Sequence, residues 1–153
     1  MNKLKLNLQL ACTNSSYIPK KIYIKRWLSI ILYNLKIKTE ITVRIVNKTE
    51  IKFLNYTYRN KNKVTNILSF PYQILNFMHT YLIGELVLCS QKIQEESIKQ
   101  KKNINAHWAH MIIHGTLHLI GHDHINKTDQ MNMESLEINY LKNLGFSNPY
   151  IKY

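Results

Sequence analysis

Six of the seven histidines of this chain lie between positions 107 and 124. His114 and His118 are four residues apart, so a helix would carry both imidazoles on one face, one turn from each other. Two imidazole nitrogens placed in this way can bind one Zn²⁺ at about 2.0 to 2.1 Å. Gly121 can adopt a left-handed backbone and end the helix, which would let His124 reach the same ion. The spacing therefore predicts a metal site formed by His114, His118 and His124.

The spacing His-x3-His-x2-Gly-x2-His is that of the metzincin zinc peptidases. Three protein ligands leave one coordination position open, which is typical of a catalytic zinc and not of a structural one. Zinc peptidases carry a glutamate general base directly after the first histidine, and this chain has Gly115 there. A peptidase is therefore disfavoured. Because a glycine costs a helix about 1 kcal/mol relative to alanine, we expect a substrate or a neighbouring backbone to approach Gly115 closely.

The other histidines of this region are expected to have different roles. His110 lies one turn before His114 on the same helix face, so we expect it to orient or pack against the ligands without binding the metal. His107 and His122 are predicted to be surface residues.

The elements that position these side chains follow from the spacing of the apolar residues. Alternation predicts strands near 3–10, 41–45, 67–70 and 82–88. Helical spacing predicts helices near 20–35, 47–58, 91–102, 106–120 and 128–144. Strands interleaved with helices predict an α+β or mixed α/β fold with helices packed on one sheet.

Three details of these helices are also expected. Asn47 with Glu50 three residues later predicts a capping box. The charged helix near 91–102 is predicted to be exposed. Glu134 and Glu137 in the last helix are predicted to face the solvent.

Length and composition restrict the class of protein. The 153 residues have one composition throughout, which predicts a single domain over residues 1–153. An apolar content of 45%, a charged content of 20% and a mean hydropathy of -0.27 exclude disordered, collagen-like and polytopic membrane proteins. Two cysteines, Cys12 and Cys89, are too few for a disulfide-stapled secreted module. We expect a cytoplasmic protein with no membrane contact and no disulfide-linked partner.

The charge of the chain favours a polyanionic partner. Twenty-one basic residues against nine acidic ones give a formal net charge of +12, which is typical of proteins that bind nucleic acid. Compositional drift is the alternative, because lysine, asparagine, isoleucine and tyrosine all have AT-rich codons. Drift does not explain why acidic residues are so scarce.

The block from His114 to His124, His-Gly-Thr-Leu-His-Leu-Ile-Gly-His-Asp-His, closely resembles the signature of the YbeY family of bacterial single-strand-specific endoribonucleases. The resemblance extends over most of residues 50–150, while the first 45 residues match only in their predicted structure. It also rests on Leu54-Asn55, Tyr58-Arg59, the run from Thr65 to Pro71, Gly84-Glu85, Cys89, Leu144-Gly145 and Pro149-Tyr150.

The resemblance implies a single four-stranded mixed sheet with surrounding helices and a zinc site on a helix and the loop after it. It implies one Zn²⁺ per chain bound by His114, His118 and His124. Arg59 would be the basic residue of the cleft, since its planar guanidinium suits a phosphate. The implied role is rRNA processing, notably maturation of the 3′ end of small-subunit (16S) rRNA, and ribosome quality control. RNA, especially rRNA precursors and ribosomal particles, would be the partner.

We expect Arg59 and His114 to be catalytic, with Arg59 neutralising charge that develops on the phosphate. Arg59, Lys61 and Lys63 would bind the RNA backbone, although an ordinary solvated loop is the alternative for the two lysines. Whether the nucleophile is a metal-activated water or the RNA 2′-hydroxyl is left open.

Three aromatic residues near this loop, Tyr58, Phe70 and Tyr72, could stack on bases. Packing in the core is the preferred interpretation for them.

Four positions depart from the family pattern. Asn62, Asn66 and Glu85 replace aspartates, and His122 replaces a tyrosine. The loss of two carboxylates would make the cleft more positive.

Three classes of function remain. A metal-dependent endoribonuclease is favoured over a non-catalytic ribosome-assembly factor with a structural zinc and over a zinc hydrolase of another substrate, peptides included. A monomer is expected because no additional apolar face is evident.

Overall fold

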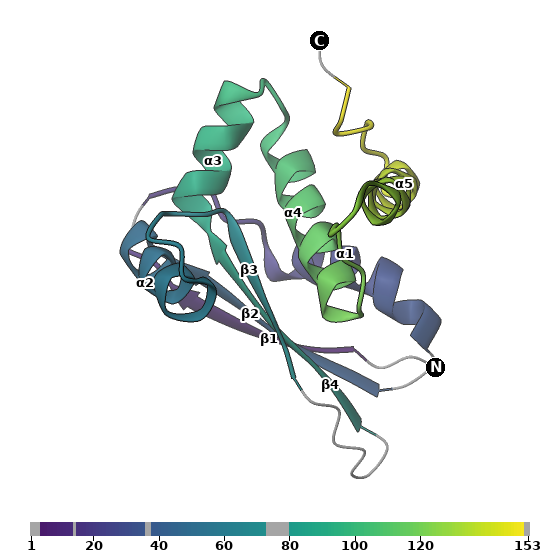
Figure 1. Ribbon diagram of the computed structural model, residues 1–153, viewed down its shortest axis with the longest axis horizontal. Helices are drawn as coiled ribbons and strands as arrows, with labels where there is room; N and C mark the ends of the chain where they lie inside the picture. Colours follow the sequence, from purple (N-terminus) through teal and green to yellow (C-terminus); the bar gives the residue numbers. More distant parts are fainter. Residues whose placement is uncertain (1–3, 14, 36–37, 73–79, 152–153) are drawn as a thin grey trace.

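In the computed structural model, residues 4–13, 15–35, 38–72 and 80–151 are described. One twisted sheet forms the centre of the chain, and helices pack around it (Figure 1). All the strands and helices expected from the sequence are present, within about three residues of their expected ends. Their order is β1 (Leu4–Ala11), α1 (Lys21–Leu32), a short 3-10 helix (Tyr33–Leu35), β2 (Lys38–Val46), α2 (Lys48–Arg59), β3 (Ile67–Pro71), β4 (Thr80–Cys89), α3 (Ser90–Lys99), α4 (Ile104–Leu119) and α5 (Lys127–Asn143).

The sheet has four strands in the order β1-β2-β4-β3. β1 and β2 are parallel, as are β2 and β4, whereas β3 pairs antiparallel with β4 and forms one edge. The expected four-stranded mixed sheet and the α+β class are therefore confirmed. Because β2 and β4 are central, each of them pairs with a strand on either side.

Two groups of apolar side chains lie on the two faces of the sheet. The larger group joins alternate residues of β2 and β4, such as Val43 and Leu86, to α1 and α4. The smaller group contains Val46, Val87 and Ile51, so α2 covers the other face. Each of these side chains is almost fully buried, which stabilises the fold by about 1.5–3 kcal/mol per large residue.

Helix α4 lies beside α1 on one face of the sheet and also contacts α3 and α5. Asn103 accepts hydrogen bonds from the backbone N–H groups of residues 105 and 106 and so caps its first turn. A Cβ at Gly115 would lie 2.5 Å from a methyl of Ile67 and 2.9 Å from one of Leu86. The expected close approach at Gly115 is therefore present, but side chains of β3 and β4 make it.

Two of the expected details of the helices are wrong. The side chain of Asn47 contacts Thr13 instead of capping α2, and Glu50 forms a bidentate pair with Arg44 at 2.6 and 2.9 Å. Tertiary partners have thus replaced the local capping box. Helix α3 is not fully exposed either, since Ile93 is completely buried against the core.

Among the described residues, no helix has the length and apolar character that crossing a membrane would require. Cys12 and Cys89 are both free thiols.

A partly buried hydrogen-bond network joins the residue before β3 to α3 and α4. The Glu96 carboxylate lies 3.0 Å from His107 Nε2 and accepts hydrogen bonds of 3.1 and 3.2 Å from the amide of Asn66. His107 is only 3% exposed, so the expectation that it lies on the surface is wrong. The asparagine at position 66 has a physical reason here, because an aspartate would place a second carboxylate against Glu96.

The network predicts how stability depends on pH. Burial raises the pKa of Glu96, but the hydrogen bonds from His107 and Asn66 outweigh it and lower the pKa below the usual value of 4.5. The stabilisation is therefore complete above about pH 4.5 and is lost as the pH falls through the folded-state pKa. We expect Glu96→Gln to lower the free energy of unfolding by about 1–3 kcal/mol at pH 7. Below pH 4.5, the difference in the free energy of unfolding between this variant and the wild type should become smaller.

Urea unfolding at several pH values measures this difference. Glu95→Gln is the matched control, because the neighbouring Glu95 forms only an exposed pair with Lys48 and should contribute at most about 1 kcal/mol. A gap between Glu96→Gln and wild type that stays constant from pH 7 to pH 3 would contradict the prediction.

Candidate metal centre

Three imidazoles converge where α4 ends. His114 and His118 lie on α4, and His124 lies in the loop that follows. Gly121, with a φ of 103°, turns the chain back, and the N–H of His122 bonds to the carbonyl of Leu117 at 3.0 Å. One nitrogen from each of the three histidines lies within 4.8 Å of the others. The structure therefore brings together the three residues that the sequence singled out as ligands.

The geometry fits a small divalent ion. The Nε2 atoms of His114 and His118 are 3.1 Å apart, close to the separation of about 3.3 Å between two nitrogen ligands of a tetrahedral zinc. The ring centroids of His118 and His124 are 5.1 Å apart. Burial and the charges of His114 and His124 lower the pKa of His118, which favours the neutral imidazole that binds metals.

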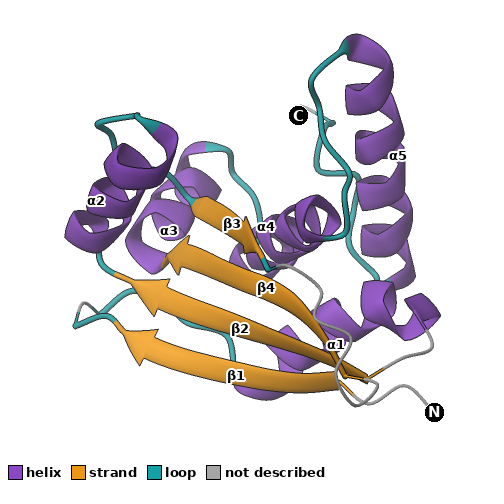
Figure 2. Cartoon of the chain, turned by 60° about the horizontal axis from the view of Figure 1, so that its bottom comes forward, coloured by secondary structure: helices purple, strands orange, loops and turns teal. Residues whose placement is uncertain are grey.

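A pocket of about 260 Å³ opens beside two of these imidazoles. It lies between α4, α5 and the C-terminal segment, which run close to one another in Figure 2. Its walls are formed by His114, His124, Gln130, Met133, Glu134, Glu137 and Tyr150.

Glu137 fixes the orientation of His114. Its carboxylate is fully buried, with Oε1 2.7 Å from His114 Nδ1 and Oε2 accepting a 2.5 Å hydrogen bond from the Tyr150 hydroxyl. Burial raises the pKa of Glu137, but hydrogen bonds from His110, His114 and Tyr150 outweigh it and lower the pKa to about 2. The carboxylate is therefore charged, and it places the proton of His114 on Nδ1. Nε2 is left with its lone pair toward the other ligands, the arrangement usual for metal-bound histidine.

His110 completes this group from the buried side of α4. Its Nε2 lies 3.3 Å from the Tyr150 hydroxyl and 3.4 Å from Glu137 Oε1. It is 6% exposed and is not one of the three converging imidazoles, as the sequence indicated. Burial and the carboxylate of Glu137 raise the pKa of Tyr150, so its hydroxyl keeps the proton that it donates. His122 is exposed, as expected.

The expectation that Glu137 faces the solvent is wrong, and the sequence held a signal for its burial. Met133, Glu137 and Leu141 follow one another at intervals of four and are the buried residues of α5. Glu137 therefore occupies an apolar position of the helix. A charged residue at such a position indicates a buried partner. Glu134, also expected in solvent, is partly buried and lines the pocket.

Arg59 is connected to this site without lining the pocket. It is the last residue of α2, and its Nη2 donates a 2.7 Å hydrogen bond to the carbonyl of Ser69 on β3. The Ser69 hydroxyl in turn donates to the carbonyl of Gly115, next to His114. Within the described segments Arg59 has no acidic partner, so its charge is available to an anion.

The remaining residues expected to bind substrate lie at the surface. Lys61 and Lys63 are exposed in the loop after α2. Tyr58 is 61% and Tyr72 is 43% exposed, so core packing was the wrong expectation for both. Tyr58 lies on α2, where its ring contacts only the edge-strand residue Phe70 among the described aromatic rings, and Tyr72 follows the end of β3. Phe70 is partly buried, with the Arg59 guanidinium 5.4 Å from its ring centroid.

Comparisons with known proteins show which family the chain resembles. The family model described as "Endoribonuclease YbeY" matches residues 12–145. The curated "Endoribonuclease YbeY" of Buchnera aphidicola subsp. Acyrthosiphon pisum (strain APS) is 46% identical over 151 residues, which cover 99% of this chain and 97% of that protein. The solution structure of TM1509 from Thermotoga maritima resembles this one with a TM-score of 0.60, covering 95% of this chain and 99% of that one. At 20% identity, the latter likeness concerns the fold alone.

The contact between Glu137 and His114 yields a prediction about metal affinity. Because Glu137→Gln removes the charge that holds the His114 tautomer, we expect zinc affinity to fall about 10- to 100-fold. Competition with a chromophoric chelator measures this affinity. Glu134→Gln is the matched control, since Glu134 lines the same pocket and accepts a 3.1 Å hydrogen bond from Gln130. Equal zinc affinities for Glu137→Gln and the wild type would contradict the assigned role.

Proposed function

This chain belongs to the YbeY endoribonuclease family, and from that premise we propose that it is a zinc-dependent endoribonuclease that cleaves single-stranded RNA. One observation carries the proposal: three imidazoles offer nitrogens within 4.8 Å of one another beside an open pocket. Three ligands are the number that catalytic zinc sites use when one position is kept for the reaction.

We infer that His114, His118 and His124 would hold one zinc ion. When bound, zinc supplies Lewis acidity, which activates water and polarises a phosphoryl oxygen. The residues around the ligands provide orientation. Glu137 fixes the tautomer of His114, and Tyr150 fixes the second carboxylate oxygen of Glu137.

Arg59 is proposed to bind the phosphate at which the P–O bond breaks. The guanidinium keeps N–H donors beyond the one used by Ser69. This hydrogen bond and the Phe70 ring hold the guanidinium in place before RNA arrives. Such preorganised positive charge stabilises the additional negative charge of the transition state. Lys61 and Lys63 would contact neighbouring phosphates.

The biological role proposed from the family is rRNA processing, notably maturation of the 3′ end of 16S rRNA, together with ribosome quality control. The substrates would be rRNA precursors and ribosomal particles in the cytoplasm. We also propose that residues 1–153 act as one domain and as a monomer.

The packing of Gly115 supports a nuclease over a peptidase. The glutamate of a zinc peptidase would project from this position toward its substrate. Here the space for a Cβ is filled by Ile67 and Leu86. A side chain at position 115 would therefore have to displace the side chains of Ile67 and Leu86.

Removal of the metal tests the proposal directly. We expect His118→Ala to lose zinc and RNA cleavage together, and a chelator to abolish cleavage by the wild type. The assay is cleavage of a labelled single-stranded RNA, with zinc measured by elemental analysis. A wild type that binds one zinc and never cleaves RNA or ribosomal particles would instead favour a non-catalytic assembly factor.

Arg59→Ala should separate metal binding from catalysis. We expect zinc to be retained and the cleavage rate to fall about 10²- to 10³-fold, the loss typical when one preorganised charge or donor is removed. Arg59→Lys should recover only part of the rate, because an ammonium cannot donate in a planar fork. Arg26→Ala is the control, because it removes an exposed arginine from a different helix, α1. An Arg59→Ala protein that cleaves at the wild-type rate would exclude the assigned role.

A further inference from the structure

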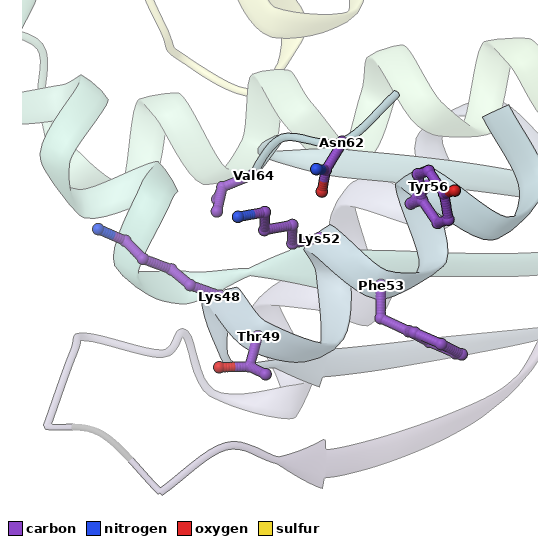
Figure 3. A pocket seen from close by; sticks show the side chains of 7 residues that line it. All are labelled: Lys48, Thr49, Lys52, Phe53, Tyr56, Asn62 and Val64. Atoms are coloured by element: carbon purple, nitrogen blue, oxygen red, sulfur yellow. The ribbon is translucent and has the colours of Figure 1, made fainter. Parts of the chain in front are cut away.

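A second hollow lies on the outer face of α2, away from the histidines. It has a volume of about 420 Å³ and shares no residue with the histidine pocket. Helices α2 and α5 lie at opposite sides of the molecule in both Figure 1 and Figure 2. We call this hollow the α2 groove, and its walls are Lys48, Thr49, Lys52, Phe53, Tyr56, Asn62 and Val64 (Figure 3).

The backbone holds the two walls of the α2 groove together. Asn60 adopts a left-handed conformation with a φ of 60° and turns the chain back along α2. The Lys61 N–H bonds to the carbonyl of Asn55 at 3.2 Å, and the Asn55 amide donates to the carbonyl of Lys63 at 3.0 Å. Asn55 is 3% exposed, so a buried side chain fastens this loop. Asn62, between the two fastened residues, therefore faces α2 in a fixed position (Figure 3).

The helical wall presents aromatic rings beside a free positive charge. Phe53 is 65% and Tyr56 is 57% exposed, and both follow Thr49 and Lys52 along one side of α2. Lys48 is paired with Glu95, whereas Lys52 has no acidic partner in the part of the chain that the structure describes. Exposed apolar side chains that lie next to one another, unlike scattered ones, are typical of interaction sites.

Rings and cations side by side are the combination that binds single-stranded nucleic acid. Bases stack on aromatic faces, whichever base is present, and ammonium groups neutralise the phosphates between them. The side-chain amide of Asn62 adds a donor and an acceptor for base edges. An acidic protein segment would use Lys52 but has no need of two exposed rings.

The α2 groove also continues the path proposed for the substrate. The loop that forms its second wall begins directly after Arg59 and contains Lys61 and Lys63. A strand of RNA held at Arg59 can thus follow this loop onto α2. We propose that the α2 groove is a second, non-catalytic binding site for single-stranded RNA, which holds the part of the substrate that flanks the cleaved bond. This inference rests on the proposed function, because the same RNA occupies both sites.

RNA length distinguishes the two sites. The test compares the Kd of a labelled RNA of about 20 nucleotides with that of a dinucleotide, whose single phosphodiester group cannot contact Arg59 and fill the groove at once. Tyr56→Ala and Phe53→Ala should each raise the Kd of the long RNA about tenfold, which is the effect of losing one stacking ring. The preference of the protein for the long RNA should fall by the same factor. Lys52→Gln should lower the salt dependence of log K for the long RNA by about 0.7, the value for one phosphate contact.

Two exposed residues on the other face of the sheet provide matched controls. Tyr33→Ala removes a ring that is 68% exposed at the end of α1, and Lys25→Gln removes an exposed lysine of α1. Both should bind the long RNA like the wild type. Thermal unfolding of every variant verifies that it is folded.

The outcomes separate this inference from the proposed function. Binding is measured on chelated protein, so it does not depend on cleavage. If the groove variants bind the long RNA more weakly and the wild type never cleaves RNA, the α2 groove is an RNA-binding site but the proposed function is wrong. If the wild type cleaves and the groove variants bind both RNAs like the wild type, the inference is overturned. Loss of binding to a polyglutamate peptide, with RNA binding intact, would overturn it in favour of a protein partner.

Discussion

Burial of the charged Glu137 carboxylate constrains this end of the molecule more than any other contact. A carboxylate removed from water without partners costs several kcal/mol, so its oxygens must be satisfied by fixed donors. His114, His110 and Tyr150 supply them, and these three residues belong to α4 and the C-terminal segment. The positions of α4, α5 and that segment therefore depend on one another. The orientation of His114 is a consequence of this arrangement, because its Nδ1 is one of the donors.

Helix α4 contributes side chains to both the hydrophobic core and the histidine site. Trp108 and Ile112 on one side are completely buried in the core. The histidines follow at intervals of three and four on another side and meet α3, α5 and the pocket. Dense packing on the apolar side keeps the helix from shifting, since cores tolerate little displacement. Two of the three converging imidazoles thus gain their precision from contacts that serve folding.

The parts of the structure that depend on local spacing could be predicted from the sequence. The three histidines converge because an i, i+4 pair and a glycine turn act within eleven residues, and the strands follow from alternation. The failures concern residues whose environment is set by distant partners. His107 can be buried because its ring forms a hydrogen bond with Glu96 on α3. Glu137 is buried because α5 packs against α4. The Asn47–Glu50 capping box is absent because Thr13, in the loop after β1, and Arg44, on β2, provide other partners. Spacing along the chain does not encode which helices meet.

The place of Tyr150 in the chain has a consequence for biosynthesis. Its hydroxyl bonds to Glu137, and it follows every strand and helix of the fold. Ribosomes make chains from the N-terminus, and the segments that emerge first can fold first. The sheet and α4 can therefore form while synthesis continues, but the Glu137 carboxylate has only His110 and His114 as donors until residue 150 has emerged. A growing chain thus carries an incompletely ordered centre long after its three imidazoles have been synthesised, and the finished arrangement appears only once residue 150 has left the ribosome.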